Sequence, residues 1–549
     1  MSLKKNIVPL FFLSVLLIGC LILPDFGMSW DEHPQREHGL VTVDYLNRVF
    51  DWGREEERYW LKLETYKSRH YGVLFQLVAY YAEDWAGAET NAERYRLRHY
   101  LGFIFFWFAS IFLYKLLKLR FGSRSIALAG TVMLFLTPRI CGHAFFNPKD
   151  TVLLSGMLIG TYTLIRFINK KNLKYALLHA LLCAVVINIR IVGIILPAFT
   201  LLFLFFEIVQ RLLHRSDRFT WLRLLWIVPV WGLFTVLLTI AGWPYLWAAP
   251  LGNLLEAFEV MSAYPWDGKI LLYGDYLHSL HLPWYYIPAW IAATLPTLYT
   301  IGGVGGMVLI LRHTFLNLLR KQVLYADVRE MIDVCAFGLF FGTIFMVVLQ
   351  NSVLYNGWRQ VYFIYPAFLI MAVGAFVTVI KYVRHLKNKK RKQIFVGILV
   401  VVFNLQIGAI LLFMYQYHPW WHLYFGLAAG KNKTERFEMD YWGVAHKEAI
   451  EKIAEFDKSG EIKVSCATGS FPGQLNWEML SPEIKQRVKY VKKLHEADYV
   501  IVGYIGKYNA DRRRALEYPF NQITVFTFSV EGDEFLRVIK TRAEDENTR

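Results

Sequence analysis

The sequence predicts a mostly α-helical polytopic membrane protein with about eleven transmembrane helices, a large first extracytoplasmic loop and a small C-terminal α/β extracytoplasmic domain. The 549 residues are 55% hydrophobic and 17% aromatic, which is too apolar for a soluble protein of this length. The apolar residues form runs of about 20, the length that crosses a bilayer. The net charge of +16 comes from Lys and Arg in short loops between these runs. That distribution indicates the positive-inside rule and excludes a nucleic-acid partner.

The first apolar run, 7–24, follows Lys4 and Lys5, which place the N-terminus in the cytoplasm. The segment 17–20 resembles a lipoprotein signal, but the run stays apolar after Cys20, so we expect an uncleaved helix. Further helices are expected at 100–114, 126–140, 151–168, on both sides of 188–190, 222–242, 284–311, 331–351, 361–380 and 394–415. The five cysteines have no metal-binding spacing, and four lie in apolar runs, so a disulfide framework is not expected.

The polar segments divide the chain into a transmembrane region, 1–417, and a soluble extracytoplasmic domain, 418–549. Within the first region, the loops 25–99 and 243–283 are too polar to cross the membrane. Amphipathic pieces at 40–50 and 71–81 are expected to lie on the membrane surface. In the tail, the pattern predicts a helix at 441–456 and strands at 462–466, 498–503, 523–530 and 535–539.

This topology gathers uncommon polar residues and aromatic residues on the extracytoplasmic side. Acidic residues cost free energy inside the hydrocarbon, so an acidic pair at its boundary suggests a site that works there. The candidates are Trp30, Asp31, Glu32, His143, Asn147, Lys149, Asp150, Arg190, Asp267, His278, His281, Trp284, Tyr355, Trp358 and Arg359.

Such a set suits the transfer of a sugar from a polyprenyl phosphate, whose reactive carbon lies at the headgroup level. Transfer to a hydroxyl group needs a carboxylate that takes the proton, and we assign this role to Asp31, with Glu32 orienting either Asp31 or the acceptor. The phosphate leaving group needs positive charge, which Arg190, Lys149 and Arg359 would supply. The predicted substrate contacts are Trp30, His143, Asn147, Trp284, Tyr355 and Trp358, with Trp266 as a further aromatic residue for the sugar or the prenyl chain.

These motifs resemble the integral-membrane glycosyltransferases of the C superfamily. The nearest group is the protein O-mannosyltransferases and aminoarabinose transferases (family 39-like), in a prokaryotic branch. The resemblance rests on Asp31-Glu32, on Asn147-Pro148-Lys149-Asp150, and on the segments 282–286, 355–359 and 437–443, and it covers about 6–380. It implies an inverting transfer with Asp31 as base, and a second acidic residue, here Asp150, that orients the acceptor or a metal.

The implied partners are a polyprenyl-phosphate-linked sugar and a lipid, glycan or protein acceptor, and the implied location is the bacterial inner membrane. The tail does not resemble the β-trefoil-type domain of eukaryotic mannosyltransferases, and no aminoarabinose-transferase signature is clear. The sequence therefore leaves the acceptor open.

Several residues also fit simpler roles. Asp150 fits a helix cap before 151–168, and Arg190 and Arg359 fit interfacial anchors. His278 and His281 are spaced as two ligands of a divalent metal, which is the one cofactor that the sequence suggests, or as ordinary loop histidines.

The alternative function is a transporter or flippase of a lipid-linked sugar. Transporters tend to show internal repeats and broken helices at the midplane, and neither is evident here. A structural subunit of a glycan-assembly complex, which would not need the acidic pair, is a further alternative.

Overall fold

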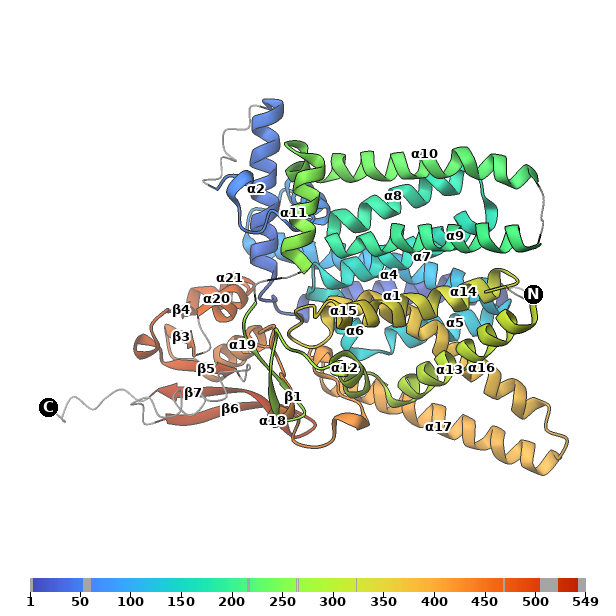
Figure 1. Ribbon diagram of the computed structural model, residues 1–549. Helices are drawn as coiled ribbons and strands as arrows, with labels where there is room; N and C mark the ends of the chain where they lie inside the picture. The colour runs from blue at the N-terminus through green and yellow to red at the C-terminus, as the bar shows by residue number, and fades with distance from the viewer. Residues whose placement is uncertain are drawn as a thin grey trace, which may run out of the picture.

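The computed structural model describes residues 3–52, 61–214, 218–262, 264, 266–321, 323–467, 470–503 and 522–541. A bundle of long helices carries a cap at one end, formed by the described residues of 25–90, 243–283 and 418–541 (Figure 1). The bundle helices are α1 (Leu3–Ile22), α4 (Asn91–Phe121), α5 (Arg124–Phe135), α6 (Pro138–Phe146), α7 (Asp150–Lys170), α8 (Leu173–Ile189), α9 (Ile195–His214), α10 (Arg218–Gly242), α12 (Tyr286–Thr294), α13 (Thr297–Lys321), α14 (Val328–Phe337), α15 (Thr343–Leu349), α16 (Tyr365–Arg384) and α17 (Lys389–Gln416).

Within the described residues, nine helical segments are long and apolar enough to cross a membrane. They coincide with nine of the eleven predicted spans. The predicted span 126–140 is the pair α5 and α6, bent by 66° just before Pro138, and counts as a tenth if the pair is one span. The remaining one, α8, has 17 residues, about 26 Å at 1.5 Å per residue, short of a hydrocarbon core of roughly 30 Å. With the bent pair and this shorter apolar helix, every one of the about eleven predicted spans corresponds to a helix or a helix pair within the described residues.

Two predicted boundaries were wrong for identifiable reasons. The predicted helix 284–311 is broken at Leu295-Pro296 into α12 and α13, because proline lacks the N–H that would continue the helix. The first loop ends at residue 90 and not at 99. Thr90 caps α4 by accepting a hydrogen bond from the Glu93 backbone N–H, while the Glu93 side chain accepts from the Thr90 N–H at 2.9 Å.

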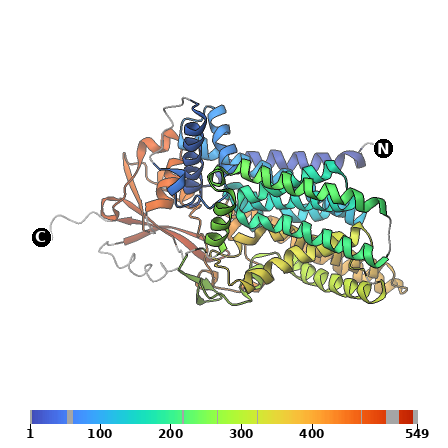
Figure 2. The same ribbon diagram turned by 45° about the horizontal axis from the view of Figure 1, so that its top comes forward.

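The two cap loops contribute helices that run across the end of the bundle. The first loop forms α2 (Glu32–Phe50) and α3 (Leu74–Trp85), which contain the predicted amphipathic pieces. The second forms α11 (Pro250–Ser262) and a hairpin of β1 (Lys269–Leu272) and β2 (Asp275–His278). Figures 1 and 2 show α2 and α11 transverse to the bundle helices.

The tail forms the predicted α/β structure. Its sheet has the order β4-β3-β5-β7-β6, in which β3 is parallel to β4 and β5, and β7 is antiparallel to β5 and β6. The elements are α18 (Lys433–Arg436), α19 (His446–Phe456), β3 (Ile462–Cys466), α20 (Ser470–Glu478), α21 (Pro482–Arg487), β4 (Val488–Tyr490), β5 (Tyr499–Gly503), β6 (Gln522–Val530) and β7 (Asp533–Thr541). The predicted helix 441–456 begins later, at His446, because the Asp440 carboxylate accepts from the N–H groups of Val444 and Ala445.

The tail packs directly onto the bundle, and one hydrophobic core contains side chains of both. The ring of Trp420, just after α17, meets Phe528 of β6 at 5.5 Å and Phe535 of β7 at 5.1 Å. The Asn476 side chain accepts a 2.8 Å hydrogen bond from the Met28 N–H and donates a 3.0 Å bond to the Met28 carbonyl. The predicted boundary at 418 remains a prediction, and these contacts run across it.

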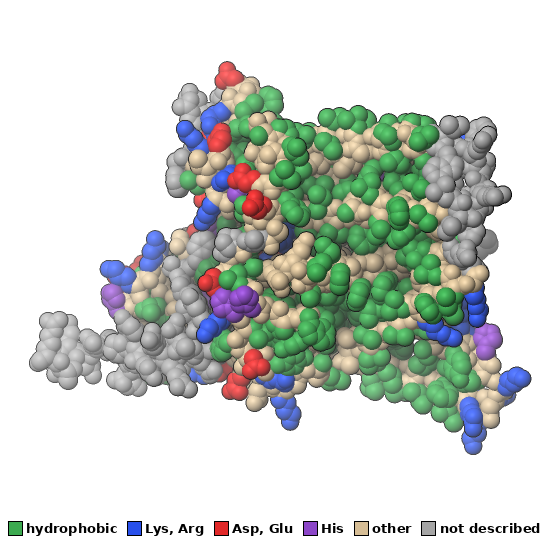
Figure 3. Space-filling view, in the orientation of Figure 1, with side chains coloured by type: hydrophobic (Ala, Val, Ile, Leu, Met, Phe, Trp, Pro, Cys, Tyr) green, Lys and Arg blue, Asp and Glu red, His purple; other side chains and the backbone are tan. Residues whose placement is uncertain are grey.

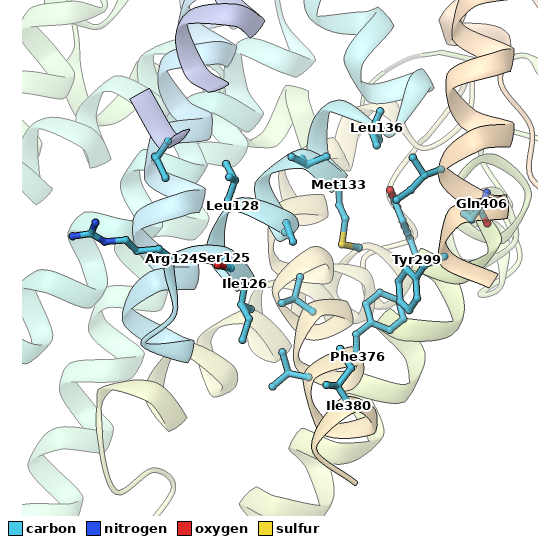
Figure 4. Close-up of a pocket in the computed structure, with 18 of the residues that line it drawn as sticks. Arg124, Ser125, Ile126, Leu128, Met133, Leu136, Tyr299, Phe376, Ile380 and Gln406 are labelled. Atoms are coloured by element: carbon cyan, nitrogen blue, oxygen red, sulfur yellow. The ribbon is translucent and has the colours of Figure 1, made fainter. Parts of the chain in front are cut away.

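The flank of the bundle is apolar, whereas charged side chains gather on the cap and at the opposite end (Figure 3). An apolar groove of about 1060 Å³ lies among α1, α5, α13, α16 and α17 (Figure 4). Leu128, Met133 and Phe376 line its middle, Arg124 lies at one end, and Tyr299 lies toward the other.

Candidate functional site

Five charged side chains meet where the bundle joins the cap, and we call them the charge cluster. They come from the start of α2, the start of α7, the end of α8 and the start of the short helix Arg359–Ile364 that leads into α16. Its members are Asp31, Lys149, Asp150, Arg190 and Arg359. All five were predicted site residues. The structure brings them into one network of ion pairs, with three cations for two carboxylates.

Asp150 is the buried centre of this network, and its side chain has no exposed area. One carboxylate oxygen pairs with Arg190, and the other accepts from Arg359 Nη1 at 2.9 Å. Asn147 organises the helix start, because its Oδ1 accepts from the Asp150 N–H at 2.9 Å and its Nδ2 donates to Asp150 Oδ2 at 3.2 Å. The proposed capping role therefore belongs to Asn147, while the Asp150 carboxylate serves the two arginines.

Asp31 lies at the edge of the cluster, and its side chain is 23% exposed. Its Oδ2 is 3.3 Å from Arg359 Nη1 and 3.8 Å from Lys149 Nζ. Asp31 stands at the N-cap position of α2, yet its side chain makes no capping bond. The carboxylate therefore faces the cations of other segments and not its own helix.

Glu32, the neighbour of Asp31, faces a different way. Its buried carboxylate accepts from the Ser29 N–H at 2.6 Å and lies 2.8 Å from His99 Nε2 of α4. These contacts tie the start of α2 to the bundle. Its expected role in orienting Asp31 or the acceptor remains a prediction, and its contacts with Ser29 and His99 support a positioning role for this turn.

Aromatic rings cover the cations. The Arg359 guanidinium lies between the rings of Tyr355, at 5.0 Å, and Trp442, at 4.6 Å, and Lys149 Nζ lies 4.3 Å from the Tyr71 ring. Tyr355 also stacks on Trp266 at 4.6 Å. Burial raises the pKa of the Tyr71 and Tyr355 phenols, so both stay neutral at physiological pH. The cluster thus has the charge of a phosphate site and the rings of a sugar or prenyl site.

The other predicted substrate residues are placed differently. His143 is fully buried, 3.3 Å from the Tyr362 hydroxyl and 3.2 Å from Asn147 Nδ2, so it supports the loop before α7. Trp358 is buried and donates to Thr294 Oγ1 at 3.0 Å. Trp284 is 70% exposed at the start of α12, which suits an interface anchor better than a substrate contact. Trp30 is 39% exposed, and its backbone N–H donates to the Trp442 backbone carbonyl.

The possible divalent metal remains a prediction. His278 pairs with Asp267 at 2.9 Å on the exposed β hairpin, and its ring is 5.9 Å from that of His281. The described ranges contain no group of three or more His, Cys, Asp or Glu that could hold a metal ion. Asp31 and Asp150 are both paired with cationic side chains, which a metal would have to displace.

Two residues of the site were not predicted. Tyr71 falls in a piece expected on the membrane surface, and Trp442 falls in the segment 437–443, which carried the resemblance without an assigned role. The combination of two acids and three aromatic rings in Phe437-Glu438-Met439-Asp440-Tyr441-Trp442 was the available signal.

Residues 99–235 match the family described as dolichyl-phosphate-mannose-protein mannosyltransferase. The matched segment contains Lys149, Asp150 and Arg190, while Asp31 and Arg359 lie outside it. This match covers part of the chain and agrees with the resemblance to the protein O-mannosyltransferase group, and the long apolar helices mark the chain as an integral membrane protein. A comparison with curated proteins gave no match.

Three solved structures are similar over most of the chain. ArnT from Cupriavidus metallidurans in the apo state is 14% identical, with 98% of each chain covered and a TM-score of 0.47. The same protein bound to undecaprenyl phosphate is 14% identical, with 98% of this chain and 99% of that chain covered and a TM-score of 0.45. The archaeal oligosaccharyltransferase AglB from Archaeoglobus fulgidus, in complex with an inhibitory peptide and a dolichol-phosphate, is 11% identical, with 92% of this chain and 70% of that chain covered and a TM-score of 0.45.

Proposed function

We propose that this glycosyltransferase moves a sugar from a polyprenyl phosphate to a hydroxyl group of a lipid, glycan or protein acceptor at the cap end of the bundle. The observation that carries the proposal is the charge cluster, in which Lys149, Arg190 and Arg359 share two carboxylates at the boundary between the apolar bundle and the polar cap. That is the depth at which a lipid phosphate lies.

The donor phosphate would bind the three cations. Asp31 is the carboxylate it would displace, because Asp31 is partly exposed and its contacts, at 3.3 and 3.8 Å, are longer than the Asp150–Arg359 contact. Asp150 is fully buried and would keep Arg190 and Arg359 in place. Donor binding would thereby release Asp31 from its cations and leave it able to accept a proton.

In the transfer step, the bond between the anomeric carbon and the phosphate oxygen breaks, and the phosphate keeps the electron pair. A bond forms from the acceptor oxygen to the same carbon on the opposite face, which inverts the configuration. Asp31 takes the proton of the acceptor hydroxyl, and the cations stabilise the charge on the leaving phosphate.

The apolar groove in Figure 4 is a suitable place for part of the prenyl chain. It ends at Leu136, three residues before Arg139, and α6 leads from there to His143 beside the cluster. The excess of Lys and Arg in loops away from the cap favours a cytoplasmic N-terminus and an extracytoplasmic tail. We propose the bacterial inner membrane as the location.

The test is transfer of radiolabelled sugar from polyprenyl-phosphate donors to a membrane extract by the purified protein in proteoliposomes. Asp31→Asn should lower the rate by about 100-fold or more, since a general base contributes about 10²–10⁴. The matched control is Asp25→Asn, which removes a half-exposed carboxylate paired with His418 at 2.7 Å, outside the cluster. Unchanged transfer by Asp31→Asn would remove Asp31 as the base. No transfer by the wild type with any donor would favour the transporter.

A further inference from the structure

Four buried polar atoms around Arg359 have no hydrogen-bond partner within the described part of the chain. They are Arg359 Nε, one carboxyl oxygen of Glu438, the Tyr441 hydroxyl and the Trp442 indole N–H. The Tyr441 hydroxyl interacts with the Trp442 and Tyr362 side chains, but without the geometry of a hydrogen bond. The four residues are only 2%, 4%, 5% and 1% exposed, respectively, so bulk water does not supply the missing partners. Burial of such atoms is unfavourable, and native proteins contain few of them.

These atoms belong to one place in the fold. The Trp442 ring covers the Arg359 guanidinium at 4.6 Å, and the Tyr441 and Trp442 rings are 5.5 Å apart. A Cβ atom on Gly357, two residues before Arg359, would lie 3.9 Å from the Tyr441 hydroxyl. Glu438 follows Phe437, which bridges to Leu272 of β1, and its carboxyl group interacts electrostatically with Arg359.

The position next to Arg359 restricts what could be bound there. In a polyprenyl-phosphate donor the sugar ring is bonded directly to the phosphate, so it must lie beside the groups that hold that phosphate. Arg359 is one of these groups under the proposed function, and Trp442 is in contact with it. Asp31 lies at the edge of the cluster and would face the acceptor.

We propose that Glu438, Tyr441 and Trp442 bind hydroxyl groups of the transferred sugar. The inference rests on the proposed function and adds to it the subsite of the sugar. A phenol both donates and accepts hydrogen bonds, an indole N–H donates, and a protonated carboxyl group does both. That mixture complements sugar hydroxyls.

The protonation of Glu438 fits this role. Burial raises the pKa of Glu438 to about 8, although the Leu271 backbone N–H and Arg359 favour the charged form. Near pH 7 most molecules therefore carry a neutral carboxyl group, which both donates and accepts hydrogen bonds.

The test measures binding of two lipids to the purified full-length protein in detergent micelles. The probes are bare undecaprenyl phosphate and undecaprenyl phosphate linked to glucose or mannose. We expect the wild type to bind a sugar-linked lipid more tightly than the bare one. Tyr441→Phe and Glu438→Leu should each lower the affinity for the sugar-linked lipid about tenfold, which is the effect of losing one hydrogen bond of about 1.4 kcal/mol. The affinity for the bare lipid should stay within twofold of the wild-type value. Glu438→Gln, which keeps a neutral donor and acceptor, should bind as the wild type does.

Thermal unfolding of the ligand-free variants separates this role from a structural one. Tyr441→Phe removes an unpartnered hydroxyl, so its melting temperature should be unchanged or higher. The matched control is Tyr365→Phe, which removes a buried hydroxyl that is bonded to Thr137. This control should melt at a lower temperature and bind both lipids normally.

A pH series adds an independent readout. Glu438 interacts electrostatically with Arg359 and Tyr286, and burial raises the pKa of Tyr286 and of Tyr441, so both phenols stay protonated while Glu438 loses its proton near pH 8. The advantage of the sugar-linked over the bare lipid should fall as the pH rises through about 8 in the wild type, and stay constant in Glu438→Gln.

Three results would overturn the assignment. If the variants bind both lipids equally more weakly, these residues act in phosphate binding or in folding. If the variants bind both lipids as the wild type does but have an altered affinity for the acceptor, the subsite binds the acceptor. Binding of neither lipid by the wild type would contradict the proposed function itself, which the first two results would leave intact.

Discussion

The helices α2 and α7 each bring an aspartate to the same charge cluster, but the two carboxylates are held in different ways. Asp150 has no exposed side-chain area and contacts Arg190, Arg359 and Asn147. Asp31 is 23% exposed, and its two ion pairs measure 3.3 and 3.8 Å. A buried charge that loses a partner is costly, whereas a partly hydrated one exchanges partners readily. The comparison therefore separates a fixed anchor from a group free to do chemistry.

The largest expected effect is on folding stability. Asp150→Asn leaves Arg190 and Arg359 buried without their main counter-charge, which should lower the free energy of unfolding by about 3–5 kcal/mol. Asp31→Asn should lower it by about 0–1 kcal/mol, as for an exposed pair. Chemical denaturation of both variants in detergent micelles measures the difference. Equal losses would erase the distinction between anchor and reactive group.

Double-mutant cycles sharpen the same contrast. We expect a coupling energy of about 2–3 kcal/mol between Asp150 and Arg190, from Asp150→Asn combined with Arg190→Met. The corresponding coupling of Asp31 with Lys149, from Asp31→Asn combined with Lys149→Met, should be below about 1 kcal/mol. A stronger coupling for Asp31 would mean that the donor phosphate cannot easily take its place.

The last contrast concerns Glu32, which is next to Asp31 in sequence and bonded to Ser29 and His99. Glu32→Gln should cost about 1–2 kcal/mol of stability, because a charge-assisted hydrogen bond becomes a neutral one. The transfer rate of the folded protein should fall less than tenfold. A rate loss as large as that of Asp31→Asn would place Glu32 in the chemistry itself.

The sequence predicted most bundle helices because a membrane span has a simple signature, a run of about 20 apolar residues. Breaks within spans were harder to predict. The sequence contains Pro138 and Pro296 at the breaks, but hydropathy does not distinguish a bent helix from a straight one. In the tail, the alternating pattern located the strands, while the start of α19 depended on side-chain bonds of Asp440.

The site was predictable as a set of residues and not as an arrangement. The residue types and the predicted topology put Asp31, Asp150, Arg190 and Arg359 on one side of the membrane. The pairing of Asp150 with residues 40 and 209 positions away depends on helix packing, which local patterns do not encode. For the same reason, the spacing of His278 and His281 suggested a metal site, whereas the hairpin pairs His278 with Asp267.

The tail contributes Trp442, which covers Arg359, and its Asn476 holds the backbone of Met28, just before Asp31. During translation the tail is synthesised after all of the bundle helices. A nascent chain therefore contains every charged residue of the cluster before it contains Trp442 and Asn476. The cluster is therefore completed at the very end of biosynthesis. Chains that stop before residue 437 would insert into the membrane with all five charges and without Trp442 over Arg359, so unfinished molecules would be kept from acting on the lipid donor.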